Sequence, residues 1–139
     1  MLIRKLEKND YHNNFLQLLS QLTIIDFNNI TFEQFSKHFD KINSDIYVII
    51  LDNKVIGCGT LLIEQKFIHN LSSVGHIEDI VIDNNYRNKG YGKIIIEYLV
   101  LKAKNEGCYK VILDCDEKNV EFYKKCNFIE KGKEMALYF

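Results

Sequence analysis

The chain has 139 residues, with 18 Lys and Arg against 19 Asp and Glu, and 47% of its residues are hydrophobic. This length suits one domain, which we expect to span residues 1–139. The net charge of −1 gives no reason to expect binding to nucleic acid or to membrane surfaces. The charged N-terminus resembles no signal peptide, and no apolar run is long enough to insert into a membrane, so we predict a cytoplasmic protein.

The four cysteines are Cys58, Cys108, Cys115 and Cys126, and no two have C-x-x-C spacing. This absence argues against a zinc knuckle or a thioredoxin-type motif. We expect free thiols and no metal. A site formed by Cys108, Cys115 and His76 is the less favoured alternative.

The first part of the chain predicts one strand and two helices. Leu2–Lys5 reads as a short strand. Apolar residues recur at helical spacing over Tyr11–Leu22 and predict a helix. The stretch Thr31–Gln34 has the spacing of a capping box, and the phenylalanines at 32, 35 and 39 indicate that a second helix follows it.

The middle of the chain predicts a hairpin and a third strand. The hairpin strands are Ile46–Leu51 and a segment from Lys54, joined at Asp52-Asn53. Lys66–Gly75 reads as a loop. The run "GHIEDIVI", Gly75–Ile82, is apolar on both faces and predicts a strand.

A polar connection, Asp83–Lys89, follows, and then a helix is predicted over Lys93–Asn105, with Gly107 as its terminator. We expect a buried strand over Cys108–Cys115 and a short helix over Val120–Cys126, which Asn119 would cap. Met135–Phe139 reads as a final strand.

Together these elements predict an α+β fold with a mixed, mostly antiparallel central sheet flanked by helices. The strand-helix-strand unit between His76 and Asp114 should be parallel.

The stretch "RNKGYGK", Arg87–Lys93, connects a strand to a helix. Gly90 and Gly92 permit positive φ and a close approach of the backbone to a ligand. Successive N–H groups can then form an anion-binding nest, and the helix N-terminus adds its partial positive charge. Because Arg87, Lys89 and Lys93 surround the same point, the stretch predicts a site for a diphosphate.

Three other readings of this loop are less favoured. One is a solvated turn without a ligand. A dinucleotide fingerprint would need a third glycine where Ile95 stands, and its turn would follow the strand directly. A Walker loop would need G-K-[ST], which does not occur.

The pattern Arg87–Gly92, placed between a strand and a helix, resembles motif A of the GNAT acetyltransferases, which bind the pyrophosphate of acetyl-CoA. Three further stretches, Glu64–His69, Gly75–Ile82 and Gly107–Cys126, are very similar to the glucosamine-6-phosphate N-acetyltransferases within that superfamily. The resemblance implies a GNAT fold and an enzyme that moves an acetyl group directly from acetyl-CoA to glucosamine 6-phosphate. The product, N-acetylglucosamine 6-phosphate, lies on the route to UDP-GlcNAc.

The resemblance also implies the residues of the site. Those implied in coenzyme binding are Ile80, Val81, Ile82, Arg87, Asn88, Lys89, Gly90, Tyr91, Gly92, Lys93, Asn119 and Tyr123. Those implied in binding the amino-sugar phosphate are Thr23, Lys66, Phe67, Ile68, His69, Glu78, Asp79, Ile80, Tyr109 and Lys110.

Four residues are the catalytic candidates: Glu78, Asp79, Asp114 and Tyr123. Adjacent residues on a regular strand face opposite ways, but a bulge could turn both Glu78 and Asp79 towards one cleft. Either could take the proton of the amine. The resemblance implies that the Asp114 carbonyl orients the amine and that Tyr123 donates to the coenzyme sulfur. The simpler alternatives are solvated strand-end carboxylates and a tyrosine of the core.

The chain departs from the family at three positions. Asn88 and Asn127 stand where glycine is usual, and Tyr138 stands where an arginine would help to hold the sugar phosphate. Lys66, His69, Lys110 or a partner subunit are candidates to replace that arginine.

The family commonly forms homodimers in which both chains build the sugar site, and Met135–Phe139 could be a pairing strand. Two other functions are less favoured: acetylation of a peptide or polyamine, and a non-enzymatic sensor that binds the coenzyme.

Overall fold

The computed structural model describes residues 1–139 and contains a five-stranded sheet in the order β1-β2-β3-β4-β5. The strands are β1 (Leu2–Lys5), β2 (Asp45–Leu51), β3 (Lys54–Gln65), β4 (Ser73–Ile82) and β5 (Cys108–Ile112). Pairing is antiparallel from β1 to β4 and parallel between β4 and β5. The predicted mixed, mostly antiparallel sheet is therefore confirmed.

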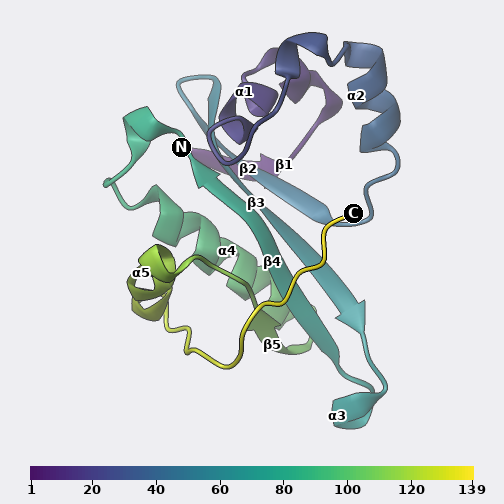
Figure 1. Cartoon of the computed structure of the whole chain (residues 1–139), viewed down its shortest axis with the longest axis vertical. Helices are drawn as coiled ribbons and strands as arrows, with labels where there is room; N and C mark the ends of the chain where they lie inside the picture. The colour runs from purple at the N-terminus through teal and green to yellow at the C-terminus, as the bar shows by residue number, and fades with distance from the viewer.

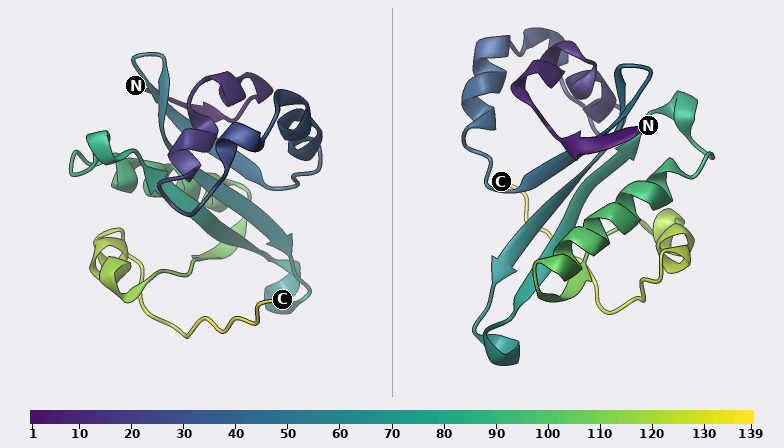
Figure 2. Two further views of the ribbon diagram at one scale, coloured as in Figure 1. Left: turned by 45° about the horizontal axis from the view of Figure 1, so that its top comes forward. Right: turned by 180° about the vertical axis from the view of Figure 1, so that it is seen from behind.

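Helices cover both faces of the sheet, with α1 and α2 on one side and α4 and α5 on the other (Figures 1 and 2). The α-helices are α1 (Phe15–Leu19), α2 (Phe32–Phe39), α3 (Ile68–Leu71), α4 (Tyr91–Asn105) and α5 (Val120–Lys125). Short 3-10 segments lie at Lys8–His12, Phe27–Asn29, Asn84–Tyr86 and Glu117–Asn119. None of these helices is both long and apolar enough to cross a bilayer.

The hydrophobic core has one cluster on each face of the sheet, because neighbouring strand residues point to opposite faces. Val48 and Val55 belong to the cluster beneath α1 and α2. Their neighbours Ile49 and Ile56 pack on the other face with residues of α4 such as Leu99. Strands β2 and β3 are thus buried on both faces, and this anchors the middle of the sheet.

The prediction of one continuous helix over Tyr11–Leu22 is wrong. Asn14 has φ 71°, in the left-handed region, and this conformation separates the 3-10 segment Lys8–His12 from α1. Asparagine adopts this conformation at low cost, and it interrupts the helical hydrogen-bond ladder. The helical spacing of the apolar residues persists across the break and hides it.

The capping box at the start of α2 is confirmed. The N–H of Gln34 donates to Thr31 Oγ1 at 3.1 Å, and the N–H of Thr31 donates to Gln34 Oε1 at 2.9 Å. The predicted hairpin turn is also confirmed, since Asp52 and Asn53 have φ 51° and 61°, as a tight two-residue turn requires.

The predicted loop over Lys66–Gly75 is wrong at its end, because β4 already begins at Ser73 and pairs with the end of β3. The hairpin of β3 and β4 therefore extends beyond the rest of the sheet, with α3 at its tip (Figure 1). His69, Asn70 and Leu71 all have positive φ there, so α3 is irregular.

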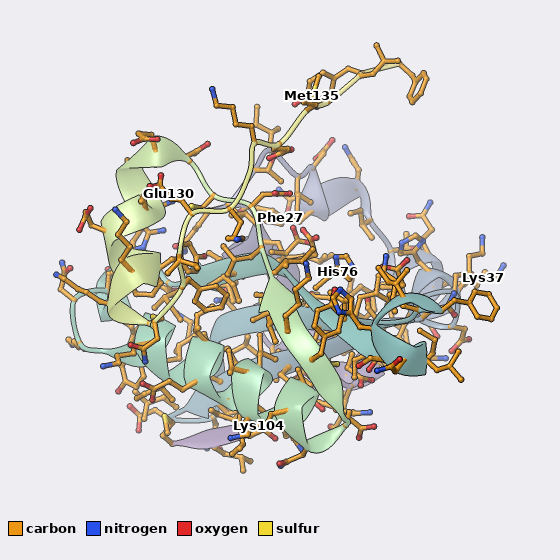
Figure 3. All side chains as sticks on the ribbon, turned by 90° about the horizontal axis from the view of Figure 1, so that it is seen from below. Phe27, Lys37, His76, Lys104, Glu130 and Met135 are labelled. Atoms are coloured by element: carbon orange, nitrogen blue, oxygen red, sulfur yellow. The ribbon has the colours of Figure 1, made fainter.

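Further corrections concern the last third of the chain. Strand β5 ends at Ile112, and it is not buried: it is the sheet edge, where Tyr109 and Ile112 are 38% and 40% exposed. Met135–Phe139 forms no strand, since it pairs with no other segment, and Figure 3 shows that Met135 lies on a chain that projects outwards. Helix α4 begins at Tyr91 rather than Lys93. Gly107, with φ 88°, ends it as predicted.

Candidate active site

Strands β4 and β5 separate halfway along β4. Their pairing runs from Ser73 and Cys108 to His76 and Ile112, whereas β4 continues to Ile82. A cavity of about 480 Å³ lies where they part. It is lined by residues of β4, the segments before and within α5, the loop after α1 and the C-terminal segment: Leu22, Thr23, Ile77, Glu78, Asp79, Ile80, Leu113, Asp114, Cys115, Asp116, Asn119, Tyr123 and Glu134.

All four catalytic candidates lie in this lining, together with the predicted ligand contacts Thr23, Ile80 and Asn119. Sequence reasoning gave no site role to Leu22, Ile77, Leu113, Asp116 and Glu134, and it considered Cys115 only in less favoured alternatives. Leu22 was assigned to a helix. Glu134 comes from the C-terminal segment, and no local signal indicates that this segment returns to the site.

The predicted bulge is present in β4. Thr60 of β3 pairs with Glu78, and Cys58 pairs with Val81, so Gly59 alone faces two residues of β4. Asp79, the first of those two, has φ 52°. The extra residue interrupts the regular alternation of side chains. Glu78 and Asp79 can therefore line the same cavity.

The environment of Glu78 makes its carboxylate more basic than usual. Partial burial raises its pKa, and the nearby carboxylates of Asp79 and Asp114 raise it further. Both effects disfavour the charged form. A proton acceptor at this position is consequently stronger than an ordinary glutamate.

Tyr123 lies in α5 with its ring between Phe122 and Phe128, whose ring centroids are 5.0 and 6.0 Å away. Burial, with contributions from Cys115 and Cys126, raises the pKa of Tyr123 to about 12. The phenol therefore keeps its proton at neutral pH and can act as a donor. Tyr123 is thus both a packed aromatic residue and part of the cavity wall.

The N-terminus of α4 is arranged to accept an anion. Gly90 has φ 89° and precedes the helix, and no side chain caps that end. The first helical hydrogen bond is donated by Ile94 to Gly90, so the N–H groups of Tyr91, Gly92 and Lys93 precede the helical ladder. A Cβ at Gly90 would meet no atom within 4 Å. These features leave room for a phosphate at the positive end of the helix.

Gly92 has a packing role that its sequence context did not indicate. A Cβ there would lie 3.1 Å from Phe122 Cζ, so the glycine lets α5 approach the start of α4. Arg87 turns back, and its Nε donates to the carbonyl of Ile82 at 3.0 Å. Lys89 lies over the ring of Tyr86 at 5.7 Å.

The two asparagines that replace family glycines have a simple explanation. Asn88 has φ 62° and Asn127 has φ 71°. Among residues with a side chain, asparagine is one of the few that adopt this left-handed conformation readily. Both positions therefore have a left-handed conformation that glycine would also adopt.

Asn119 precedes α5, but its side chain makes no capping hydrogen bond, contrary to the prediction. Its backbone instead donates to the carbonyl of Asp116 in the preceding 3-10 turn. The side chain is therefore not committed to a cap.

The remaining predicted sugar-site residues lie outside the cavity lining. Those on the β3–β4 hairpin are Lys66, Phe67, Ile68 and His69, and those on β5 are Tyr109 and Lys110. His69 stacks on Tyr109 with ring centroids 4.0 Å apart, which joins the two groups. The structure thus forms two clusters, the cavity and this hairpin surface.

A hydrogen bond joins the loop after α1 to the connection that follows β4. Gln21 Oε1 accepts a hydrogen bond from the N–H of Asn84 at 2.8 Å. The loop containing Thr23 is thereby tied to the connection that leads to the glycine loop.

No group of three or more His, Cys, Asp or Glu side chains has the arrangement of a metal site, and all four cysteines are free thiols.

Comparison with known proteins agrees with this geometry. Residues 5–128 match the acetyltransferase (GNAT) family model. The chain is 46% identical to glucosamine 6-phosphate N-acetyltransferase 1 of Dictyostelium discoideum, covering 97% of this chain and 88% of that protein. It is 42% identical to the glucosamine 6-phosphate N-acetyltransferase of Arabidopsis thaliana, covering 99% and 95%.

Solved structures lead to the same family. The crystal structure of the Arabidopsis thaliana enzyme aligns with a TM-score of 0.94 at 41% identity, over 99% of this chain and 97% of that one. An acetyltransferase of Trypanosoma brucei aligns with a TM-score of 0.92 at 33% identity, over 99% of each chain. The chain therefore belongs to the GNAT acetyltransferase family.

Proposed function

We propose that this protein acetylates the amine of glucosamine 6-phosphate with acetyl-CoA, giving N-acetylglucosamine 6-phosphate on the route to UDP-GlcNAc. The observation that carries the proposal is the cavity in which Glu78, Asp79, Asp114 and Tyr123 meet. The relatives named as glucosamine 6-phosphate N-acetyltransferases support the choice of substrate. We treat residues 1–139 as one acetyltransferase domain that works in the cytoplasm.

Direct acetyl transfer needs a neutral amine aimed at the thioester carbonyl, donors for the negative charge on the oxygen, and a donor to the departing sulfur. The cavity residues supply all three. Glu78 or Asp79 takes a proton from the substrate ammonium, directly or through water, while the Asp114 carbonyl orients the amine. The N–H group of Ile80 stabilises the negative charge that develops on the thioester oxygen, and the backbone of Val81 meets the acetyl-CoA arm. The Tyr123 hydroxyl donates to the departing sulfur. Acetyl-CoA supplies the activated acetyl group.

The glycine loop is the proposed pyrophosphate site. Its uncapped helix N-terminus and the open space on the side of Gly90 where a Cβ would lie suit a diphosphate. Charge from Arg87, Lys89 and Lys93 adds to the attraction. The backbone of Ile80, Val81 and Ile82 and the side chain of Asn119 would contact the rest of the coenzyme along the opening of the sheet.

We further propose a homodimer in which a second chain completes the sugar-phosphate site. Strand β5 is an unpaired sheet edge with Tyr109 and Ile112 partly exposed. The C-terminal segment exposes apolar side chains: Met135, Leu137, Tyr138 and Phe139 are all at least 80% exposed. Pairing between such segments of two chains would bury this surface. Sedimentation of the full chain, and of a form shortened after Glu134, would test it, with a monomeric full chain contradicting it.

An assay of free thiol release decides the substrate. The panel should contain glucosamine 6-phosphate, glucosamine, a polyamine and a peptide amine. We expect turnover with the first and little with the others. Equal turnover of glucosamine 6-phosphate and glucosamine would favour a different acceptor. It would agree with Tyr138 standing where the resemblance implies a phosphate-binding arginine. Coenzyme binding without turnover of any amine would indicate a sensor.

A further inference from the structure

Cys58 lies directly beside the bulge of β4, yet the mechanism above gives it no task. Its side chain is 1% exposed and packs in the apolar cluster with Leu18, Val48 and Val81. Its Sγ donates to the main-chain carbonyl of Asp79 at 3.8 Å. Burial raises the pKa of Cys58 to about 12, so the thiol keeps the proton that it donates.

The orientation of the Asp79 carbonyl, which contacts Cys58, also determines the orientation of the Ile80 N–H. The Asp79 carbonyl and the Ile80 N–H belong to one planar trans peptide, so they point in opposite directions. Cys58 is on β3, whereas the other neighbour of β4 is β5. A carbonyl that faces Cys58 leaves the Ile80 N–H directed away from Cys58, and Ile80 lines the cavity beyond the point where the pairing with β5 has stopped.

The bulge makes this peptide dependent on such support. Asp79 and Ile80 face the single residue Gly59, so the regular ladder is interrupted at this point. Asp79 also has φ 52°, a conformation that costs energy for a residue with a side chain. A donor beneath the Asp79 carbonyl favours this conformation over a flipped peptide.

We propose that Cys58 is a positioning residue for acetyl transfer: its thiol holds the Asp79 carbonyl and thereby aims the Ile80 N–H into the cavity. There the N–H stabilises the charge on the thioester oxygen. The inference rests on the proposed function. It assigns a mechanistic role to a buried side chain that touches neither substrate.

The competing explanation is that Cys58 only fills space in the core. A filler can be replaced by an apolar side chain of similar size with an effect on stability alone. Replacement of a positioning residue instead lowers kcat, because the interaction that the residue supports forms chiefly in the transition state.

Three variants separate these explanations. Cys58→Val fills the space without a donor, and Cys58→Ser has a hydroxyl that is too short to reach the Asp79 carbonyl across 3.8 Å, so it also lacks the hydrogen bond. Cys108→Val is the matched control, because it removes a thiol that contacts Ser73 Oγ at 3.5 Å, at the paired end of β4 and β5. Folding is checked by circular dichroism, and initial rates of thiol release give kcat and KM.

We expect Cys58→Val to lower kcat roughly 3- to 10-fold, the effect of one modest hydrogen bond, with the KM for acetyl-CoA changed less than about twofold. Cys58→Ser should lose a similar part of kcat, and Cys108→Val should match the wild type. Wild-type kcat in folded Cys58→Val or in folded Cys58→Ser would overturn the proposal.

The infrared S–H stretching band of the full wild-type chain gives a measurement that needs no variant kinetics. The difference spectrum between wild type and Cys58→Ser isolates the Cys58 band. A band shifted to the frequency of a hydrogen-bonded thiol supports the contact, and an unshifted band overturns the proposal. Lack of turnover by the wild type with glucosamine 6-phosphate would instead contradict the proposed function, whatever the infrared result.

Discussion

The coenzyme end and the sugar-phosphate end of the candidate site are built in different ways. At the coenzyme end, Gly90, the first turn of α4 and the end of β4 are neighbours in sequence, and one chain assembles them. At the sugar-phosphate end, the cationic candidates Lys66 and Lys110 lie on the hairpin and on β5, outside the cavity.

This difference indicates which end depends on a second chain. A helix N-terminus binds an anion through groups that local folding supplies. Lys66 is partly exposed and pairs with Glu64 at 3.2 Å, and Lys110 is exposed, so neither lysine is held towards the cavity. We therefore expect the coenzyme end to be complete in a monomer and the sugar-phosphate end to need the proposed dimer.

The chemistry between the two ends gives the largest expected effect. Tyr123→Phe removes the donor to the sulfur and should lower kcat about 100-fold, the range of general acid catalysis. Coenzyme affinity, measured by calorimetry, should stay nearly unchanged. Tyr98→Phe is the control, since Tyr98 packs against Tyr47 away from the cavity. A small loss at Tyr123, or an equal one at Tyr98, would refute the role of Tyr123.

The coenzyme end is tested by Gly90→Val. A valine is strained at φ 89°, and a shift of the backbone that relieves this strain would displace the N–H groups at the start of α4. We expect about a 10-fold rise in the KM for acetyl-CoA. Gly107→Val is a close control, because Gly107 has φ 88° and equally open surroundings at the opposite end of α4. Both variants should lose stability, but a raised coenzyme KM in the Gly107 variant would contradict the assignment.

The sugar-phosphate end is tested by Lys66→Ala and Lys110→Ala. Each should raise the KM for glucosamine 6-phosphate about fivefold, the effect of one exposed charge pair, and leave the KM for acetyl-CoA unchanged. Lys37→Ala, which affects an exposed pair with Glu33, serves as the control. If neither Lys66→Ala nor Lys110→Ala raises the KM for glucosamine 6-phosphate, the phosphate is bound elsewhere. The contrast between the two ends is then lost.

The smallest expected effect is a change in stability, and it concerns Glu78 in the cavity between the two ends. Its raised pKa means that ionisation of Glu78 lowers stability as pH rises from the unfolded pKa through the folded one. Glu78→Gln should therefore raise the melting temperature at pH 7 by about 1 to 3 °C, a small value because solvent screens this exposed group. Below the unfolded pKa of about 4.3 the two proteins should melt alike. A variant that melts lower at pH 7 would show that the carboxylate is stabilising.

Features that depend on adjacent residues could be predicted from the sequence. The capping box at Thr31, the turn at Asp52 and the glycine loop before α4 all follow from local backbone preferences. The neighbouring carboxylates of Glu78 and Asp79 suggested that a bulge could turn both into one cavity, and β4 contains a bulge there. The family resemblance added a proposed role for Tyr123, which spacing alone does not reveal.

Other features depended on contacts distant in sequence, and only the tertiary structure decided them. The Met135–Phe139 segment has strand-like composition but no partner within the chain, so it forms no strand. Strand β5 reads as buried, yet it lies at the sheet edge. The contact between Cys58 and the Asp79 carbonyl joins residues 21 positions apart. By itself the sequence determined the local turns, caps and loop chemistry, because these depend on backbone preferences of neighbours. Strand pairing, exposure and the shape of the cavity were decided by long-range packing, which local patterns do not encode.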